Sequence, residues 1–136
     1  MMDFNVLFVQ MSRPARAGSV VVSGAEGPTA GLVNGIYEPT NELCNDLPVY
    51  QKKTDSGVWM ECIMHSGEYK WYIKPTANRG PTDKTSYASC PVDGGMSGLP
   101  QNCKSGKWDV GTGKGFVNQP STTCVIYIAK TEESDV

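Results

Sequence analysis

Histidine is nearly absent from this chain of 136 residues, which contains only His65. A Ser–His or Cys–His mechanism would have to use that one imidazole. His65 lies in a predicted turn, where an exposed polar side chain needs no further role. The cysteines include no CxxC pair, and His65 has no Cys or His partner at a metal-ligand spacing. These absences argue against both a His-dependent enzyme and a zinc site, and no cofactor is expected.

Charge and long apolar runs are also scarce. Charged residues make up 19% of the chain and the net charge is −2, so the basic surface that attracts nucleic acids is missing. No apolar run approaches the roughly 20 residues that cross a bilayer as a helix. We therefore expect no nucleic-acid partner and no transmembrane segment. The glycine-rich run at 111–115 lacks the spacing of a phosphate-binding loop and is expected to be a hairpin turn.

Short runs of β-branched and aromatic residues recur along the chain, separated by Gly, Pro, Asn, Asp and Ser. This pattern is typical of consecutive antiparallel strands. Helical periodicity is absent, and at most a single turn is expected, at 39–43. The predicted fold is all-β, a small twisted antiparallel meander that is either barrel-like or a two-layer sheet. The strands are expected around 20–22, 36–37, 49–50, 59–61, 71–73, 87–89, 108–110, 116–117 and 124–128, with the clearest turns at 45–46, 55–57 and 65–67.

Three parts are expected along the chain: an extended N-terminal arm at 1–18, a β-rich domain at 19–129 and a polar, acidic C-terminal tail at 130–136. The apolar stretch at 6–9 is too short for a secretory signal, and Asp3 stands where a basic residue belongs. Residues 12–18 are basic and small, which suits an extended docking arm or the remnant of a transit segment. The arm residues expected to contact a partner are Phe4, Leu7, Phe8, Arg13 and Arg16.

The chain has five cysteines, so at least one thiol is unpaired within it. Cys90 and Cys103 flank a loop rich in Gly and Pro and are the candidate disulfide. Closing a loop of about a dozen residues would stabilise the fold by roughly 3 kcal/mol in the chain-entropy model. The alternative is that both are small, buried thiols that pack as hydrophobic side chains.

Aromatic side chains on one face of a sheet could stack against sugar rings or anchor a protein partner. Alternation along the strands places Trp71 and Ile73 on one face and Tyr72 on the other. Glu61 is expected to be a solvent-facing charge opposite Lys70 or Lys74. The alternative for most of the aromatics is that they form the core of a small domain. The candidate binding aromatics are Tyr37, Tyr50, Trp59, Tyr72 and Trp108.

One order of residues is shared with a known module. The run Asn34-Gly35-Ile36-Tyr37 is followed by Pro48-Val49-Tyr50, then by Trp59, Trp71 and Trp108. This order resembles an uncharacterised β-rich repeat of marine protists and algae with secondary plastids, over residues 19–120. The resemblance implies a widely reused module, which favours binding or assembly over catalysis, and it makes a plastid complex one candidate host.

The sequence therefore predicts a non-catalytic protein-interaction module, an accessory or structural subunit docked on a multi-subunit assembly. An enzyme would require His65 to converge with a Cys or an acid in a pocket, and nothing in the sequence indicates that. The alternative function is a carbohydrate-binding module that uses exposed aromatics to hold a glycan.

Overall fold

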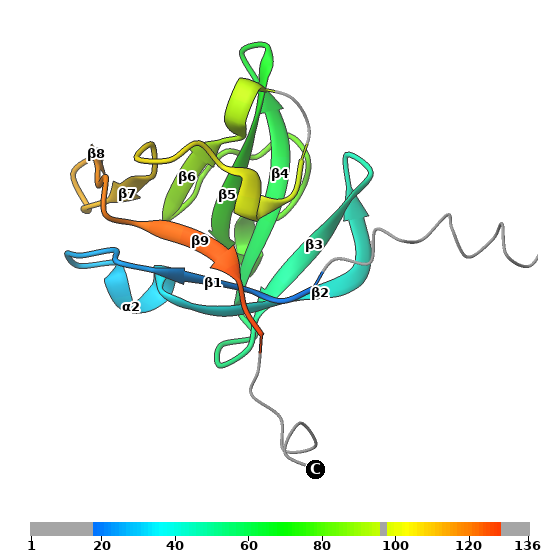
Figure 1. Cartoon of the computed structure of the whole chain (residues 1–136), viewed down its shortest axis with the longest axis horizontal. Helices are drawn as coiled ribbons and strands as arrows, with labels where there is room; N and C mark the ends of the chain where they lie inside the picture. The colour runs from blue at the N-terminus through cyan, green and yellow to red at the C-terminus, as the bar shows by residue number, and fades with distance from the viewer. Residues whose placement is uncertain (1–17, 96–97, 129–136) are drawn as a thin grey trace, which may run out of the picture.

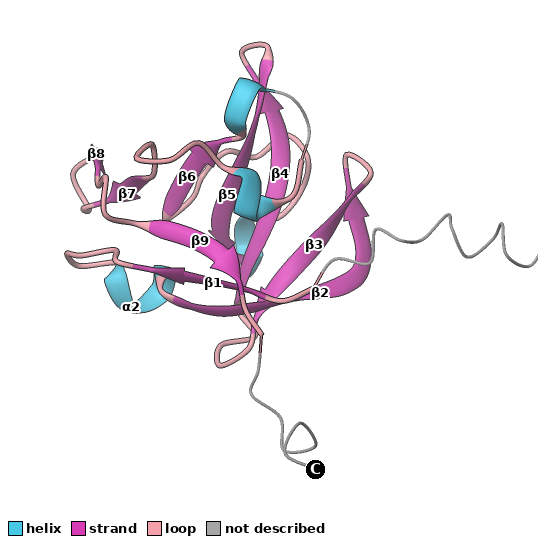
Figure 2. Cartoon of the chain, viewed as in Figure 1, coloured by secondary structure: helices cyan, strands magenta, loops and turns pink. Residues whose placement is uncertain are grey.

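The computed structural model describes residues 18–95 and 98–128, and its main feature is one nine-stranded antiparallel sheet curled into a half-barrel (Figure 1). The all-β prediction is confirmed, and of the two predicted architectures the barrel-like one is closer. Figure 2 shows that helix is limited to short turns between the strands. These turns are α2 (Ala30–Val33), η1 (Thr76–Asn78), η2 (Asp93–Gly95) and η3 (Pro100–Asn102). The strands are β1 (Val20–Ser23), β2 (Gly35–Cys44), β3 (Leu47–Lys52), β4 (Val58–His65), β5 (Glu68–Pro75), β6 (Ala88–Pro91), β7 (Asp109–Gly111), β8 (Phe116–Asn118) and β9 (Thr123–Ile126).

The sheet is a meander whose last strand returns to its first. Each strand from β1 to β8 pairs with the next one along the chain, and β9 pairs with β1 at the opposite edge from β8. Because only residues 119–122 connect β8 to β9, the two edges of the sheet must lie close together, which forces the curl. The Gln119 side chain holds this closure: its amide accepts from the Glu26 N–H at 2.7 Å and donates to the Glu26 carbonyl at 2.9 Å.

Two of the predicted turns have the left-handed backbone that tight hairpins need. Asn45 and Asp46, between β2 and β3, have φ values of 56° and 67°. Ser66 and Gly67, between β4 and β5, have φ values of 54° and 84°. Positive φ at both central residues matches the right-handed twist of the flanking strands, so these turns set the register of both hairpins. The predicted hairpin at 111–115 is also present, between β7 and β8.

The two faces of the sheet both bury apolar side chains. The main core lies inside the curl and takes residues from nearly every strand, with Trp71 and Trp108 as its largest side chains. A smaller cluster on the outer face contains Cys44, Val49, Ile63 and Tyr72. The predicted alternation of Trp71 and Ile73 against Tyr72 is therefore confirmed, although both faces are covered at this point in the sheet.

The single helical turn expected at 39–43 is wrong, because β2 runs through this segment. Pro39 pairs with Tyr50 and Leu43 pairs with Pro48, and the register shifts between these two pairs. The Thr40 hydroxyl supports the irregular stretch by donating to the Val49 carbonyl at 2.7 Å. An isolated helical turn gains one hydrogen bond for several fixed dihedrals, so pairing with β3 outweighs any local helical preference.

Lys52 ties α2 to the sheet from β3. Its ammonium donates to the carbonyls of Gly31 at 2.7 Å and Leu32 at 2.9 Å, and only 5% of the residue is exposed. Burial lowers the pKa of Lys52. Gly35 makes this approach possible: its φ is 151°, and a Cβ there would lie 2.6 Å from the Lys52 Cε. The missing side chain thus leaves the space through which the lysine reaches the helix end.

Within residues 18–95 and 98–128, no helix has the length and apolar character required to cross a membrane.

We expect the Lys52→Met substitution to lower the free energy of unfolding by about 1–3 kcal/mol. It removes the lysine donor from the Gly31 carbonyl and leaves the Leu32 carbonyl with only the longer bond from the Tyr37 hydroxyl, at 3.3 Å. Urea denaturation followed by tryptophan fluorescence measures the change. The neighbouring Lys53 is exposed, so Lys53→Met is the matched control and should change stability by less than about 0.5 kcal/mol. Equal losses in the two variants would contradict a structural role for the Lys52 hydrogen bonds.

Candidate functional site

The outer edge of β9 has unpaired main-chain groups. The Tyr127 N–H donates to the Ser19 carbonyl at 2.9 Å. In an antiparallel pair, every second residue of a strand directs its main-chain N–H and C=O toward the neighbouring strand. The main-chain groups of Val125 and Thr123, like those of Tyr127, therefore face β1. The N–H and C=O groups of Cys124 and Ile126 therefore point away from β1. No partner for them occurs in the part of the chain that the structure describes. Such an edge is a template for another strand.

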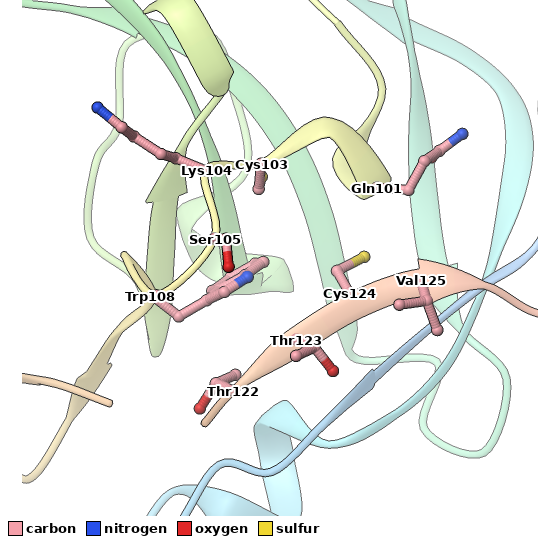
Figure 3. Close-up of a pocket in the computed structure, with 10 residues that line it drawn as sticks. Gln101, Cys103, Lys104, Ser105, Trp108, Thr122, Thr123, Cys124 and Val125 are labelled. Carbon is pink, nitrogen blue, oxygen red and sulfur yellow. The ribbon is translucent and has the colours of Figure 1, made fainter. Parts of the chain in front are cut away.

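A cavity of about 190 Å³ lies beside this edge, between β9 and the segment 101–108. Figure 3 shows Cys124 rising from β9 toward the segment that carries Gln101 and Cys103, with Trp108 at one end of the space. We call this space, together with the open edge of β9, the β9 groove. Lys104 is the one charged residue among its lining side chains.

Two polar atoms at the β9 groove are buried without a hydrogen-bond partner in the described structure. These are the Oε1 of Gln101 and the Oγ1 of Thr122, a residue that is only 1% exposed. Leaving a buried polar atom unsatisfied costs about 1–3 kcal/mol. Because both atoms are closed to solvent, a ligand could bond them only by displacing part of the segment that covers them.

Apolar side chains continue the groove along and beyond β9. Val125 is 49% exposed, Ile126 is 56% exposed and Ile128 is 83% exposed. Val125 and Ile126 lie on opposite faces of the strand. The groove therefore offers apolar contacts on both sides of the open edge.

The thiols beside the groove are poor nucleophiles. Burial, followed by the proximity of Cys90, raises the pKa of Cys124 to about 12. The hydrogen bond with Cys90 and burial raise the pKa of Cys103 well above its usual value. A neutral thiol attacks slowly, because the thiolate is the reactive form. The groove is thus better suited to binding than to thiol chemistry.

The expected disulfide between Cys90 and Cys103 is not formed, and all five cysteines are free thiols. The Cys90 thiol donates to the Lys104 carbonyl at 3.4 Å, and the Cys103 thiol donates to the Cys90 carbonyl at 3.6 Å. Backbone pairing already holds the two ends of the loop together, through the Val92–Cys103 bridge and the Lys104 N–H, which donates to the Pro91 carbonyl. The alternative interpretation, small thiols packed in the interior, agrees with this geometry.

The predicted binding aromatics do not form an exposed platform. Tyr37, Tyr50 and Trp108 are buried in the main core, and Tyr72 is buried on the outer face. Trp59 is half-buried, and the Arg79 guanidinium lies 4.0 Å from the centre of its ring. With only three Phe and three Trp in the chain, these rings are needed to fill the interior.

Glu61 is not the solvent-facing charge that was expected, although one of the two lysines named as its partner, Lys74, does pair with it. Glu61 is 2% exposed and its Oε1 accepts from the Lys74 ammonium at 3.0 Å and the Gly80 N–H at 2.9 Å. Its Oε2 accepts from Arg79 at 3.1 Å, and Arg79 also binds Glu42. This ion network fastens the loop after η1 onto the outer face of the sheet. Sequence reasoning missed it because the loop that buries Glu61 lies 19 positions further along the chain.

The remaining predicted residues lie elsewhere. His65 ends β4, and its Nδ1 is 3.3 Å from the Tyr72 hydroxyl, with no cysteine or acid converging on it among the hydrogen bonds of the described residues. No group of three metal-ligating side chains occurs within residues 18–95 and 98–128. The expected arm residues Phe4, Leu7, Phe8, Arg13 and Arg16, and the tail at 130–136, lie outside the described residues.

Sequence reasoning also missed the polar residues of the β9 groove, which are Gln101, Lys104 and Thr122. One signal was available: Cys124–Ile128 is a continuous apolar run instead of an alternating one. In a strand at a sheet edge, apolar residues on both faces indicate a surface that another chain can cover.

No protein-family model, curated protein or solved structure matches the chain. The resemblance to the protist and algal repeat therefore stays a prediction, and the function must be argued from the geometry.

We expect Glu61→Gln to lower the free energy of unfolding by about 3–5 kcal/mol, because it leaves the buried Lys74 ammonium without its counter-charge. Chemical denaturation measures the loss. Glu42 is the matched control: it binds the same Arg79 but its side chain is 55% exposed, so Glu42→Gln should cost less than about 1 kcal/mol. If both substitutions cost the same, the network would be a surface feature with no part in holding the loop.

Proposed function

We propose that this protein is a non-catalytic protein-interaction module that binds an extended segment of a partner protein along the β9 groove. In this role it is an accessory subunit of a larger assembly. The observation that carries the proposal is the edge of β9 that faces away from β1. There the unpaired N–H and C=O groups belong to Ile126, which is 56% exposed, and to Cys124, which is only 8% exposed, so the accessible part of the edge begins at Ile126. A partner strand placed there would extend the sheet by main-chain hydrogen bonds.

The unsatisfied atoms support the same location. Gln101 Oε1 and Thr122 Oγ1 flank the edge of β9 from two different segments. A main-chain amide or a polar side chain of the partner would satisfy them. Main-chain pairing supplies affinity without sequence preference, so specificity must come from side chains at alternate positions of the partner strand.

The surroundings of the groove define the chemistry of that partner. Exposed apolar side chains at Val125, Ile126 and Ile128 favour a strand with apolar residues. Lys104 is the single charge in the lining and lies on the opposite side of the space from Val125 (Figure 3), so it favours a carboxylate at that side of the bound segment. The proposed ligand is therefore an extended peptide in which apolar residues alternate with at least one Asp or Glu.

Catalysis is a weaker explanation of the same groove. Its two thiols, Cys103 and Cys124, have raised pKa values, and the Cys103 thiol donates to the Cys90 carbonyl. The carbohydrate alternative, which used exposed aromatics, loses its platform because four of the five candidate rings are buried and the fifth is covered by Arg79.

The test is selection from a displayed library of random peptides of roughly ten residues, about the upper length of a natural strand. The selected peptides should alternate apolar residues with an acidic one. Ile126→Pro removes the outward N–H without breaking a bond to β1, so it should weaken binding at least about tenfold in calorimetry. Thermal unfolding confirms that the variant is folded.

A charge-reversed pair isolates the role of Lys104. Lys104→Glu should weaken the same peptides by roughly three- to tenfold, because it repels their carboxylate. Lys107→Glu is the matched control, since Lys107 is also exposed but does not line the groove. The proposal fails if no peptide is enriched, or if the selected peptides bind the Ile126→Pro variant as tightly as the unaltered protein.

A further inference from the structure

A second cavity, of about 210 Å³, opens on the outer face of the sheet, and it shares no lining residue with the β9 groove. We infer that this cavity binds an acidic sugar, a single pyranose ring that carries a carboxylate. We call it the β5–β8 cleft, after the strands that supply most of its walls. Its lining includes the charged residues Lys70, Lys84 and Asp109, the hydroxyl residues Tyr72 and Ser89, and the ring of Phe116.

Strand register builds the floor of the β5–β8 cleft. Tyr72 pairs with Ser89, and Ser89 pairs with Asp109, so three polar side chains stand in a row across β5, β6 and β7. The Tyr72 hydroxyl lies 3.3 Å from the His65 Nδ1, which holds the phenol in place. The hydroxyls of Tyr72 and Ser89 can donate and accept hydrogen bonds, and the Asp109 carboxylate can accept them. Together they can bind the adjacent hydroxyls of a sugar.

Two lysines make the net charge of the cleft lining positive. Lys70 and Lys84 line it, and neither forms a salt bridge with any residue that the structure describes. Asp109 is the only carboxylate in the lining, and its carboxylate accepts one hydrogen bond from the residues that the structure describes, from the Asn118 amide at 3.5 Å. The lining therefore has two unpaired ammonium groups and one carboxylate. An anionic group on the ligand would compensate the excess positive charge.

Phe116 supplies the apolar wall. Phe116 is 53% exposed and belongs to β8, in which all three residues are exposed. Aromatic rings commonly cover an apolar face of a ligand while polar groups fix its orientation. Positive charge, hydroxyl partners and an open ring at one cavity together describe a charged sugar better than a simple anion, which would need no apolar wall.

The size of the cleft limits the ligand to one ring. Cavities for drug-sized molecules are about 300–1,000 Å³, and the β5–β8 cleft is smaller, at about 210 Å³. A small ligand held by few contacts binds weakly, so we expect a dissociation constant near 1 mM, which corresponds to about −4 kcal/mol.

The test is an NMR titration of the full chain with glucuronate, glucose, acetate and sulfate as separate probes. Glucuronate should shift the amide signals of Lys70, Tyr72, Ser89 and Asp109 with saturation in the millimolar range. Glucose tests the ring without the charge, and acetate and sulfate test the charge without the ring. All three should bind at least about tenfold more weakly than glucuronate.

Substitutions identify the contributions of charge and ring. Lys70→Gln combined with Lys84→Gln should weaken glucuronate at least about tenfold, and Phe116→Ala by roughly threefold. Lys114→Gln is the matched control, because Lys114 is exposed on the adjacent hairpin but does not line the cleft. Unchanged spectra away from the cleft confirm that each variant is folded.

Two results would overturn the inference. If acetate or sulfate shifts the same signals as strongly as glucuronate, the cleft is a simple anion site. If none of the probes shifts them, the cleft binds no acidic sugar. Neither result bears on the β9 groove, since the peptide experiment uses different residues on a different strand.

Discussion

Hydrogen-bonded pairing between β9 and β1 joins segments that are 100 positions apart in the chain, as Ser23 and Thr123 show. The rest of the fold depends on this pairing. It brings the end of the meander back to its beginning, so the sheet must curl and enclose Trp71 and Trp108. Figure 1 shows the last strand lying along the first, with the remaining strands curving away behind them. The closure is incomplete, because β9 gains a neighbour on one side only.

That incomplete closure explains the proposed docking site. A fully closed barrel has no strand edge, whereas this half-barrel leaves one side of β9 facing the segment 101–108 across a small cavity. Natural sheets usually protect an edge with charge, proline or a covering loop. Here the nearest covering segment leaves Gln101 Oε1 and Thr122 Oγ1 unsatisfied and leaves Val125 and Ile126 exposed. The accessible part of this edge, at Ile126, is where we propose that a partner strand binds.

The outer face of the sheet has two parts that differ in how their charged side chains are paired. Around β4 and the start of the loop after η1, Glu61 and Lys74 neutralise each other while Arg79 covers Trp59, which makes this part a structural contact. Further along β5 to β8, Lys70 and Lys84 have no such partners in the described structure, and the surface is hollowed. The compensated charges lie where the outer face contacts the loop that covers it, and the two uncompensated lysines lie at the cavity that we propose binds a ligand.

Local sequence signals predicted the strands, the turns at 45–46 and 65–67, and the two-faced alternation of Trp71 and Tyr72, because φ preferences and the period of two are properties of neighbouring residues. They also pointed to the interior as one use of the aromatics. Local sequence signals could not predict which edges of the sheet meet. They also could not predict which charges become buried or which polar atoms lack partners. Glu61 was expected in solvent because the Arg79–Gly80 segment that covers it comes from another part of the chain. The β9 groove and the β5–β8 cleft likewise exist only where distant strands pair in a particular register, and register across a curled sheet is decided by the packing of the whole domain.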